Sequence, residues 1–341
     1  MKPDLGAREG GIGHGGEDMT AKRATPEPGS VADAVEGNWV DRLAPAPWRP
    51  YLRLSRADRP IGAWLLLLPC WWGLLLAVNA DPAGPRWEDL WIFAGCFMGA
   101  FLMRAAGCTW NDITDRHFDA QVARTRSRPI PSGQVSVSGA IVWMVAQSLA
   151  ALLILLTFDS AAIILGFVSL LPVAIYPFAK RFTWWPQVFL GIAFNWGALL
   201  AWAAHAGGLG WPPVLLYLSG MAWTLFYDTI YAHQDKEDDA LIGVKSTARL
   251  FGARTRAWLA GFLVASVALM GLAVLLAMLP AGASPLALVL ALAGVMGFGW
   301  HLNWQLRRLD IDDADVCLHL FRANRDAGLI PVLFLAAAVA A

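Results

Sequence analysis

Long apolar runs dominate the chain from residue 61 onward. Short polar segments divide them into nine predicted helices, at 61–80, 90–110, 139–158, 160–179, 187–206, 212–232, 258–279, 285–304 and 328–341. Most reach the ~20 residues that an α-helix needs to cross ~30 Å of hydrocarbon, and only the last is short. Lipid tolerates only helices or closed barrels, and these runs are too long for barrel strands. The pattern therefore predicts an all-α, polytopic membrane protein with nine transmembrane helices.

The first 48 residues have a different character. Residues 1–48 are rich in Gly, Pro, Ala and charged side chains and lack apolar periodicity, which predicts a disordered cytoplasmic tail before a membrane domain at 49–341. No apolar segment follows a basic start, as a secretory signal would require, and eight acidic residues disfavour a mitochondrial presequence. We therefore expect a protein of the bacterial inner membrane.

Basic residues mark one side of the predicted bundle. Alternating helices place four loops on that side, and these loops contain Arg116, Arg124, Arg126 and Arg128; Lys180 and Arg181; Lys236, Lys245, Arg249, Arg254 and Arg256; and Arg307, Arg308, Arg322 and Arg325. The opposite loops hold one base, Arg86. The positive-inside rule places the amino terminus and the four basic loops in the cytoplasm.

Composition narrows the function classes. Hydrophobic residues make up 57% of the chain and charged residues 15%, against about 25% charged in a typical soluble protein. The mean hydropathy of +0.50 disfavours a soluble enzyme. The 26 basic residues balance the 26 acidic ones, so charge gives no support to a nucleic-acid partner. No Cys pair has CxxC spacing and no His pair has HxxxH spacing, which argues against zinc.

A first acidic motif extends the second apolar run. If the helix continues beyond Trp110, then Asn111, Asp112, Asp115 and Asp119 share one face. Carboxylates at this spacing repel one another unless a counter-charge is present. Mg²⁺ prefers oxygen ligands and binds through carboxylates together with substrate phosphates. The motif is therefore a candidate metal site.

A second acidic motif follows the sixth apolar run, on the same side of the membrane. Asp228, Tyr231, Asp235 and Asp239 step by 3, 4 and 4 residues, again along one helix face. One such stretch would be interpreted as a solvated loop. Two matched stretches at helix ends of a membrane protein favour a function, because acids there are costly. The two faces are placed to hold one diphosphate between them through Mg²⁺.

Cations accompany the acids. Arg128 lies in an Arg-rich loop, and such side chains neutralise phosphate oxygens, although any single one is equally explained as a topology signal. Lys180 and Arg181 follow the aromatic segment Tyr176–Phe178. They have two interpretations, binding of an aromatic acid's carboxylate or anchoring of the helix at the lipid interface.

These motifs resemble those of the UbiA superfamily of intramembrane prenyltransferases. The family pattern NDxxDxxxD matches Asn111 to Asp119, and its DxxxD pattern matches Asp235 to Asp239. The resemblance extends from about residue 50 to the end and is strongest to the branch that prenylates 4-hydroxybenzoate. Further matching segments are Arg56–Gly62, Met103–Cys108, Arg128–Gly133, Tyr176–Arg181, Pro186–Val188, Tyr227–Thr229 and Ile242–Thr247.

The resemblance implies nine helices around a central cavity, with a cytoplasmic cap formed by the loops after the second and sixth helices. It implies Mg²⁺, a polyprenyl diphosphate donor and 4-hydroxybenzoate as acceptor, giving 3-polyprenyl-4-hydroxybenzoate for ubiquinone biosynthesis. The expected catalytic and metal-binding residues are Asp112, Asp115, Asp119, Asp235 and Asp239, with Asn111 as a further metal and substrate ligand. The expected phosphate-binding cations are Arg56, Arg116, Arg128, Lys180 and Lys245. Arg181 is expected on the benzoate carboxylate, and Asp228 and Tyr231 are further substrate-binding residues.

Three alternatives remain open at this point. A sister branch of the superfamily would use homogentisate, a naphthoate, haem or chlorophyllide as acceptor. A transporter or channel would be expected to carry acids near mid-membrane and to show inverted repeats, which the sequence does not. A structural subunit of a membrane complex would leave both acidic motifs unexplained.

Overall fold

Long helices form almost all of the molecule. The computed structural model describes residues 37–121, 125–236, 243 and 245–341, and it contains no strand within these ranges. Nine of the described helices are long: α3 (Ile61–Ala80), α4 (Trp87–Asp119), α5 (Val137–Leu155), α6 (Ser160–Phe182), α7 (Pro186–Ala206), α8 (Trp211–Ala232), α11 (Thr255–Met278), α12 (Pro285–Arg308) and α13 (Ala314–Val339). The all-α prediction is confirmed, and each of the nine apolar runs lies on one of these helices.

Length and apolar composition qualify seven described helical segments as membrane spans. These are α3, α4, α5, α6, α7 and α12, together with residues 247–278, where the short helices α10 (Thr247–Phe251) and η3 (Gly252–Arg254) lead into α11. Helices α8 and α13 do not meet the same criterion within the described part of the chain. The protein is a multi-pass membrane protein, and nine crossings remain a prediction.

Two helices extend beyond their apolar runs. Helix α4 continues to Asp119, so the first acidic motif is helical as expected. Helix α13 begins at Ala314 rather than near residue 328, because the Asp313 side chain caps it by accepting from two backbone N–H groups. Its first half also contains a buried Asn324, whose amide donates to Gln305 of α12 at 2.9 Å. Hydropathy missed this half because it carries charged side chains such as Arg325 and Asp326, and because the buried Asn324 is satisfied by partners on other helices.

The described end of the predicted tail is helical. Residues 37–48 contain α1 (Trp39–Leu43) and η1 (Ala46–Trp48), which lead directly into α2 (Arg49–Leu54). The Trp39 ring donates a hydrogen bond to the carbonyl of Ala57 at 2.9 Å. Described helical structure is therefore present before residue 49, and residues 1–36 lie outside the described part of the chain.

Local sequence signals set several helix starts and ends. Short polar side chains cap α5, α6 and α12, namely Ser136, Asp159 and Ser284, each accepting from a backbone N–H in the first turn. Helix α7 ends at Ala206, and the following Gly207 has a φ of 71°, a left-handed conformation that favours glycine. The loops between α5, α6, α7 and α8 are short, so these consecutive helices are antiparallel.

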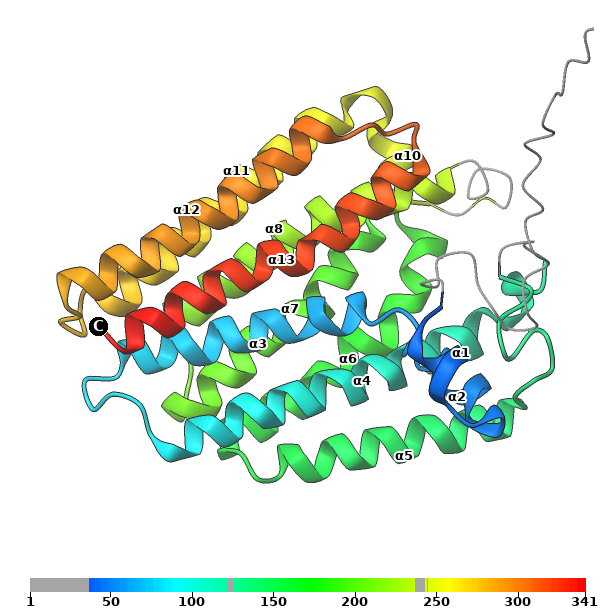
Figure 1. The fold of residues 1–341 in the computed structure, drawn as a ribbon, viewed down its shortest axis with the longest axis horizontal. Coiled ribbons are helices and arrows are strands. Elements are labelled where there is room, and N and C mark those ends of the chain that lie inside the picture. Colours follow the sequence, from blue (N-terminus) through cyan, green and yellow to red (C-terminus); the bar gives the residue numbers. More distant parts are fainter. Residues whose placement is uncertain (1–36, 122–124, 237–242, 244) are drawn as a thin grey trace, which may run out of the picture.

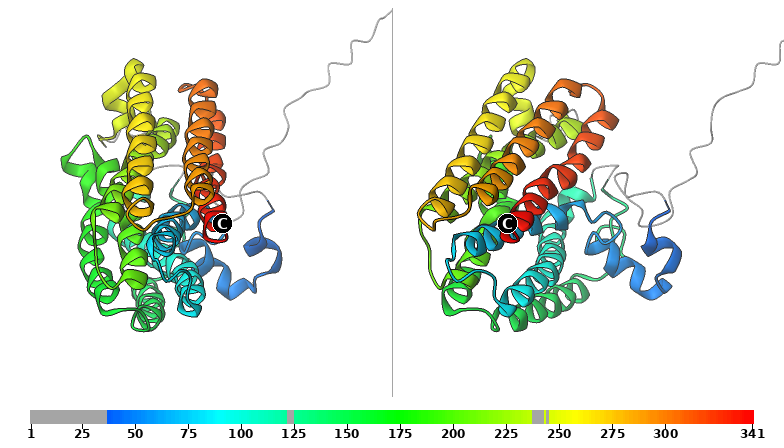
Figure 2. Two further views of the ribbon diagram at one scale, coloured as in Figure 1. Left: turned by 90° about the vertical axis from the view of Figure 1, so that its left-hand side faces the viewer. Right: turned by 60° about the vertical axis from the view of Figure 1, so that its left-hand side comes forward.

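Helix α3 lies at the centre of the bundle. It packs against α4, α7 and α13, while α8 packs between α7 and α11, and α12 packs on α11 and α13. Figures 1 and 2 show α11 and α12 along one edge and α4 and α5 along the opposite edge. The rings of Trp72, Trp223 and Phe298 meet in the core at centroid distances of 5.0–5.8 Å. The Trp72 N–H is satisfied by the carbonyl of Gly328 at 2.8 Å.

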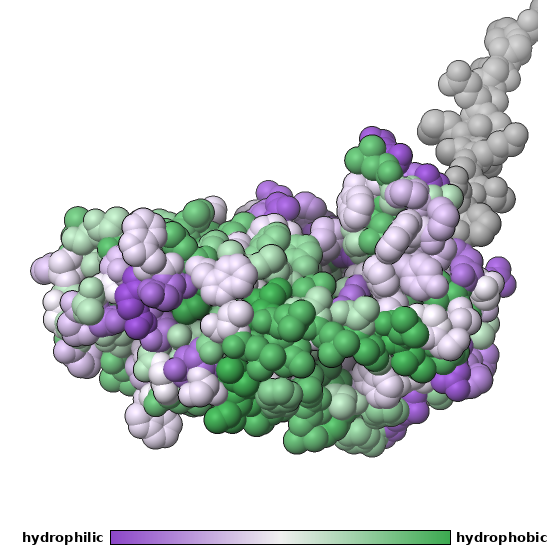
Figure 3. Space-filling model, turned by 90° about the horizontal axis from the view of Figure 1, so that it is seen from below, coloured by the Kyte–Doolittle hydropathy of each residue, from purple (hydrophilic) through white to green (hydrophobic). Residues whose placement is uncertain are grey.

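The surface has the apolar band expected of a membrane protein. Figure 3 shows hydrophobic side chains across the middle of one face and polar side chains at both ends. Exposed apolar residues include Leu153 on α5 and Ile164 and Leu171 on α6. The carboxyl ends of α4, α6 and α8 meet at one end of the bundle, the end that carries the basic loops (Figure 1).

Candidate active site

The last two turns of α4 bury three carboxylates. Asp112 is fully buried, Asp115 is 1% exposed and Asp119 is also buried. Their spacing places them on one face of the helix, as the sequence predicted. Carboxylates near a helix carboxyl terminus are disfavoured by the helix dipole as well as by one another. The arrangement therefore requires cations from elsewhere in the fold.

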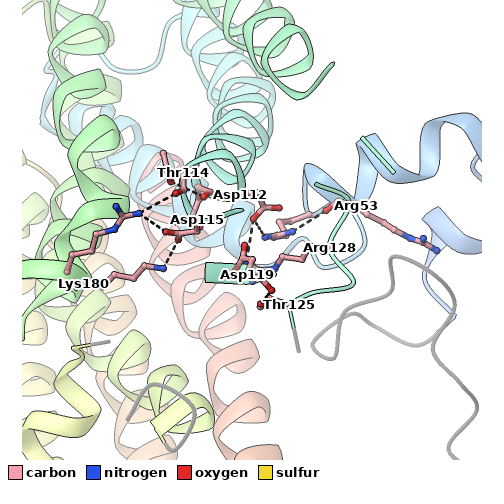
Figure 4. A network of polar contacts seen from close by, with 11 residues as sticks. Arg53, Asp112, Thr114, Asp115, Asp119, Thr125, Arg128 and Lys180 are labelled. Atoms are coloured by element: carbon pink, nitrogen blue, oxygen red, sulfur yellow. Dashed lines mark hydrogen bonds and ion pairs between the residues drawn. The ribbon is translucent and has the colours of Figure 1, made fainter. Parts of the chain in front are cut away.

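Two arginines from separate segments approach Asp112 and Asp119. Arg56, which follows α2, donates to Asp112 at 2.6 Å. Arg128, in the loop between α4 and α5, donates to Asp119 at 2.8 Å and lies 3.4 Å from Asp112 (Figure 4). The loop is fastened to α4 by Thr125, whose hydroxyl donates to the Asp119 carbonyl at 2.9 Å. Both arginines thus cross-link α2, α4 and the following loop.

Two more cations come from the end of α6. Lys180 donates to Asp115 at 2.5 Å and Arg181 donates to the same carboxylate at 3.2 Å. The Arg181 guanidinium also lies over the rings of Phe118 and Phe178, with its Cζ 5.2 and 5.0 Å from their centroids. Both side chains therefore bind the protein carboxylate Asp115 in this structure.

Arg56 adopts an unusual backbone conformation. Its φ of 57° is the one positive φ that the structure describes at a residue other than glycine. Such a conformation costs roughly 1 kcal/mol or more and persists only where the surroundings enforce it. The preceding Ser55 is held by α5, because its hydroxyl accepts from Trp143 at 2.8 Å and from Gln147 at 2.9 Å. The backbone is thereby turned so that Arg56 reaches Asp112.

A cavity of about 520 Å³ lies beside this cluster. Asn111, Arg56 and Arg128 line it near the carboxylates, and α8 contributes Asp228 and Tyr231. The rest of the wall is mostly apolar and comes from α3, α4, α5, α6, α7 and α13. A charged mouth on an apolar chamber suits a ligand with an anionic head and a hydrocarbon tail.

Arg104 lies in the matching segment Met103–Cys108, but the sequence analysis gave it no role at the site. It lines the cavity from α4, two helical turns before Asn111, and its Cζ lies 5.1 Å from the centroid of the Phe194 ring. Its Nε is buried and has no hydrogen-bond partner among the residues that the structure describes. A lone arginine inside an apolar run was the signal that could have identified it.

The second acidic motif is only partly on a helix. Asp228 and Tyr231 lie on α8, and the Tyr231 ring packs on Phe321 of α13 with centroids 4.4 Å apart. Helix α8 then ends at Ala232 and gives way to the 3₁₀ turn η2 (His233–Asp235), so the expected continuous helical face stops there. Asp239 lies outside the described residues, and the placement of the Asp235 side chain is likewise outside them.

Two predicted phosphate ligands take other partners. Arg116 donates to the carbonyl of Ile113, one turn back in α4, at 2.8 Å. Lys245 donates to the carbonyl of Phe182 at 3.4 Å, and its backbone N–H donates to the carbonyl of Lys180. Lys245 is therefore beside the α6 cations, whereas Arg116 is not joined to the carboxylates by any contact described.

The sequence of this chain is similar to a known protein family and to individual proteins of that family. Residues 66–325 match the UbiA prenyltransferase family. The chain belongs to this family. It is 48% identical to the mitochondrial 4-hydroxybenzoate polyprenyltransferase of Mus musculus, over 92% of this chain and 81% of that protein. It is 45% identical to the Homo sapiens protein of the same name, over 96% of this chain and 85% of that one.

Solved structures of UbiA homologs share the fold. A homolog from Archaeoglobus fulgidus, bound to GPP and Mg²⁺, superposes with a TM-score of 0.63 at 19% identity, covering 86% of this chain and all of that one. The apo homolog from Aeropyrum pernix K1 gives a TM-score of 0.61 at 22% identity, covering 82% and 96%. The family resemblance and the fold class expected from the sequence are confirmed.

The carboxylates of this UbiA family member fit a hard divalent cation. All three are oxygen donors on one helix face, and the Asp112 Oδ2 atom is buried without a hydrogen-bond partner among the described residues. Within the described part of the chain, no three His, Cys, Asp or Glu side chains converge as a complete metal site. The remaining predicted ligands, Asp235 and Asp239, are those whose side chains are not described.

Proposed function

We propose that this enzyme transfers a polyprenyl group from a polyprenyl diphosphate to 4-hydroxybenzoate, at the ring carbon ortho to the hydroxyl, in a divalent-metal-dependent reaction. The product would be 3-polyprenyl-4-hydroxybenzoate, for ubiquinone biosynthesis. The observation that carries the proposal is a buried carboxylate cluster, paired with cations, of which Arg56 and Arg128 also line an apolar cavity. The names of the mouse and human relatives support the acceptor.

The diphosphate of the donor would lie between the acidic motifs. Asn111, Asp112, Asp115, Asp119, Asp235 and Asp239 would hold Mg²⁺, which supplies charge neutralisation for the leaving diphosphate when bound. Arg56, Arg128, Lys180 and Arg181 already contact the carboxylates and would rotate toward phosphate oxygens. Lys245 is a nearby further cation. Fixed donors of this kind stabilise charge that grows as the allylic carbon–oxygen bond breaks.

The acceptor would lie deeper in the cavity. Arg104 offers a fork-shaped donor for the benzoate carboxylate. We favour it over Arg181 because its Nε is buried and has no hydrogen-bond partner among the described residues. The sequence favoured Arg181 for that role, but Arg181 does not line the described cavity and already binds Asp115. Asp228 and Tyr231, which line the same cavity from α8, would orient the phenol end of the ring.

The chemical step would be an electrophilic substitution on the ring. The carbon–oxygen bond to diphosphate breaks, and the ring carbon ortho to the hydroxyl attacks the allylic carbon. The proton on that ring carbon then passes to a carboxylate of the second motif or to the released diphosphate, which restores aromaticity. The apolar walls of the cavity keep water away from the allylic cation.

The positive-inside rule supports a cytoplasmic location for the site, because the basic loops and the carboxylates are at the same end of the bundle. We propose the inner membrane of a bacterium, on the acid-rich character of residues 1–48. The mouse and human relatives are named as mitochondrial proteins.

A transfer assay tests the proposal. Purified protein in liposomes would receive geranyl diphosphate, radiolabelled 4-hydroxybenzoate and Mg²⁺, with EDTA in a parallel sample. We expect lipid-soluble label only when Mg²⁺ is present. Product from homogentisate or a naphthoate, but not from hydroxybenzoate, would move the protein to a sister branch. Absence of product with every acceptor would overturn the enzymatic assignment.

A further inference from the structure

The segment of α1, η1 and α2, residues 38–54, stands beside the bundle of long helices. Figures 1 and 2 show α1 and α2 to one side of it, at the end that carries the basic loops. Helix α2 fixes the segment there, because Leu54 is fully buried in a core cluster with Ile113 of α4. Tyr51 packs on Trp143 of α5, with ring centroids 5.5 Å apart. We call residues 38–54 the amino-terminal segment.

The outer face of α1 is apolar. Val40 and Ala44 are buried, whereas Trp39 and Leu43, one turn apart, are 49% and 79% exposed. Trp48 in η1 is exposed as well. A helix at an aqueous surface normally has polar side chains on its outer face. An outer face of Trp and Leu is instead typical of a helix that lies in the interface between membrane and water.

The exposed apolar surface of the amino-terminal segment continues onto α5. The ring of Trp48 packs edge-on against that of Trp143, with centroids 5.9 Å apart. On the turns of α5 around Trp143, Val142 and Val145 are exposed. Because α5 qualifies as a membrane span, these two side chains belong to its lipid-facing surface. Lipid that covers the first turns of α5 therefore also reaches Trp48.

Two arginines accompany the apolar face. Arg42 is exposed and Arg49 is half-exposed, and neither pairs with a carboxylate in the part of the chain that the structure describes. Asp41, the acidic residue of the segment, is already bound by Arg53 at 2.8 Å. The outer surface of the segment thus combines apolar rings with unneutralised positive charge. This combination favours an anionic lipid layer over a neutral one.

The same segment supports Arg56 of the candidate active site. The Trp39 ring N–H donates to the carbonyl of Ala57, the residue after Arg56, at 2.9 Å. The ion pair of Arg53 with Asp41 joins α2 to α1. Arg56 itself has a positive φ, a conformation that persists only when its surroundings enforce it. A displacement of α1 would therefore reach the turn that carries Arg56.

We propose that the amino-terminal segment binds the anionic phospholipid surface of the membrane beside α5. Its exposed apolar side chains enter the interface, and Arg42 and Arg49 contact lipid phosphates. Binding holds the turn at Arg56 in place, so anionic lipid increases the rate of prenyl transfer. The effect on transfer rests on the proposed function, whereas the binding of lipid does not.

The first test measures where α1 lies. The four native cysteines are buried, so a cysteine introduced at an exposed position can be labelled selectively with a water-soluble, thiol-reactive fluorophore. Leu43→Cys is compared with Asp312→Cys in vesicles of phosphatidylcholine with added phosphatidylglycerol. Asp312 is a matched control, because its side chain is 79% exposed and it lies between α12 and α13, at the same end of the bundle. We expect nitroxide-labelled lipid to quench the label at residue 43 at least about threefold more strongly. Equal quenching at the two positions would overturn the proposal.

The second test measures the effect of lipid charge on transfer. The wild type, Arg42→Glu and Arg307→Glu are assayed in phosphatidylcholine vesicles with and without phosphatidylglycerol. Arg307 is a matched control, since it is an exposed arginine near the end of α12, outside the amino-terminal segment. We expect phosphatidylglycerol to accelerate the wild type and Arg307→Glu by up to about fivefold, the strengthening that one basic side chain gives to binding at an anionic surface. Arg42→Glu should lose most of this acceleration.

The outcomes separate this inference from the proposed function. If the wild type transfers no prenyl group in either vesicle, the proposed function fails, and the quenching test still decides whether α1 binds lipid. If the wild type is equally active in both vesicles, or Arg307→Glu loses the acceleration as Arg42→Glu does, the link from lipid to Arg56 is refuted. Strong quenching at residue 43 together with selective loss in Arg42→Glu would support the whole proposal.

Discussion

Asp115 and Asp112 offer a direct test of how charge is distributed in the site. Asp115→Asn removes a carboxylate whose partners Lys180 and Arg181 are 32% and 39% exposed, so water can solvate both cations afterwards. Asp112→Asn removes one whose partners Arg56 and Arg128 are only 11% and 17% exposed. The two substitutions are chemically identical, but they differ in how far water can reach the cations that remain.

The expected magnitudes follow from that difference. Removing the partner of a cation that water can reach costs at most about 1 kcal/mol, as in exposed ion pairs, whereas removing the partner of a buried cation typically costs about 3–5 kcal/mol. Arg128 keeps its contact with Asp119, so the larger cost arises at Arg56. Asp115→Asn should therefore change stability little, and Asp112→Asn should lower the free energy of unfolding by several times as much. Both should lose catalysis, since removing one fixed group that stabilises transition-state charge costs about 10²–10³-fold in rate.

The assay combines two measurements on each purified variant in detergent. Thermal unfolding reports stability, and Mg²⁺-dependent prenyl transfer to 4-hydroxybenzoate reports activity. We expect Asp115→Asn to unfold within a few degrees of wild type with activity reduced at least about 100-fold, and Asp112→Asn to unfold distinctly earlier. Asp115→Asn with more than a tenth of wild-type activity would refute the assignment of Asp115. Equal unfolding temperatures for the two variants would refute the reasoning from burial.

Three further predictions concern other parts of the site. Arg104→Gln should raise the KM for 4-hydroxybenzoate by about 10- to 100-fold, because a hydrogen bond to a charged group contributes about 1.5–3 kcal/mol. The KM for geranyl diphosphate should be unchanged. Steady-state kinetics with each substrate varied in turn checks both values. Asp235→Ala should insert and fold, as judged by size-exclusion chromatography, but should lose Mg²⁺-dependent transfer. Burial, with Lys236 nearby, lowers the pKa of His233 from 6.5 to about 4. The folded chain then binds fewer protons than the unfolded chain between these values, so stability should fall as the pH decreases through that window. His233→Gln should flatten this dependence in thermal unfolding between pH 7 and pH 5.

Hydropathy predicted the helices well where a helix is apolar throughout. A run of about 20 apolar residues has few alternatives in lipid, which is why α3, α5 and α7 lie close to their predicted ranges. It failed for the first half of α13, because Asn324 is satisfied by Gln305 and Trp223, which are distant in sequence. Whether a polar residue can be buried depends on partners that a local window does not contain.

The candidate site was predictable to a similar degree. Helical spacing alone predicted that Asp112, Asp115 and Asp119 share a face, because that geometry is local. It could not predict that Arg56 and Lys180 would converge on them, since this depends on the packing of α2 and α6 against α4. Motif matching selected these cations. It included Arg104 within the segment Met103–Cys108 without giving it a role, and the structure adds that this side chain lines the cavity.

The hydrogen bond between Trp72 and Gly328 joins residues that are 256 positions apart. During synthesis, α3 is among the first long helices made, yet its core partner α13 is the last. The centre of the bundle, and the Tyr231–Phe321 contact at the cavity wall, can therefore form only after nearly the whole chain has been translated. Until then, part of the packing surface of α3 is exposed to lipid or to an insertion factor. A ribosome-stalled chain that ends before residue 314 should consequently be inserted but should lack a finished cavity.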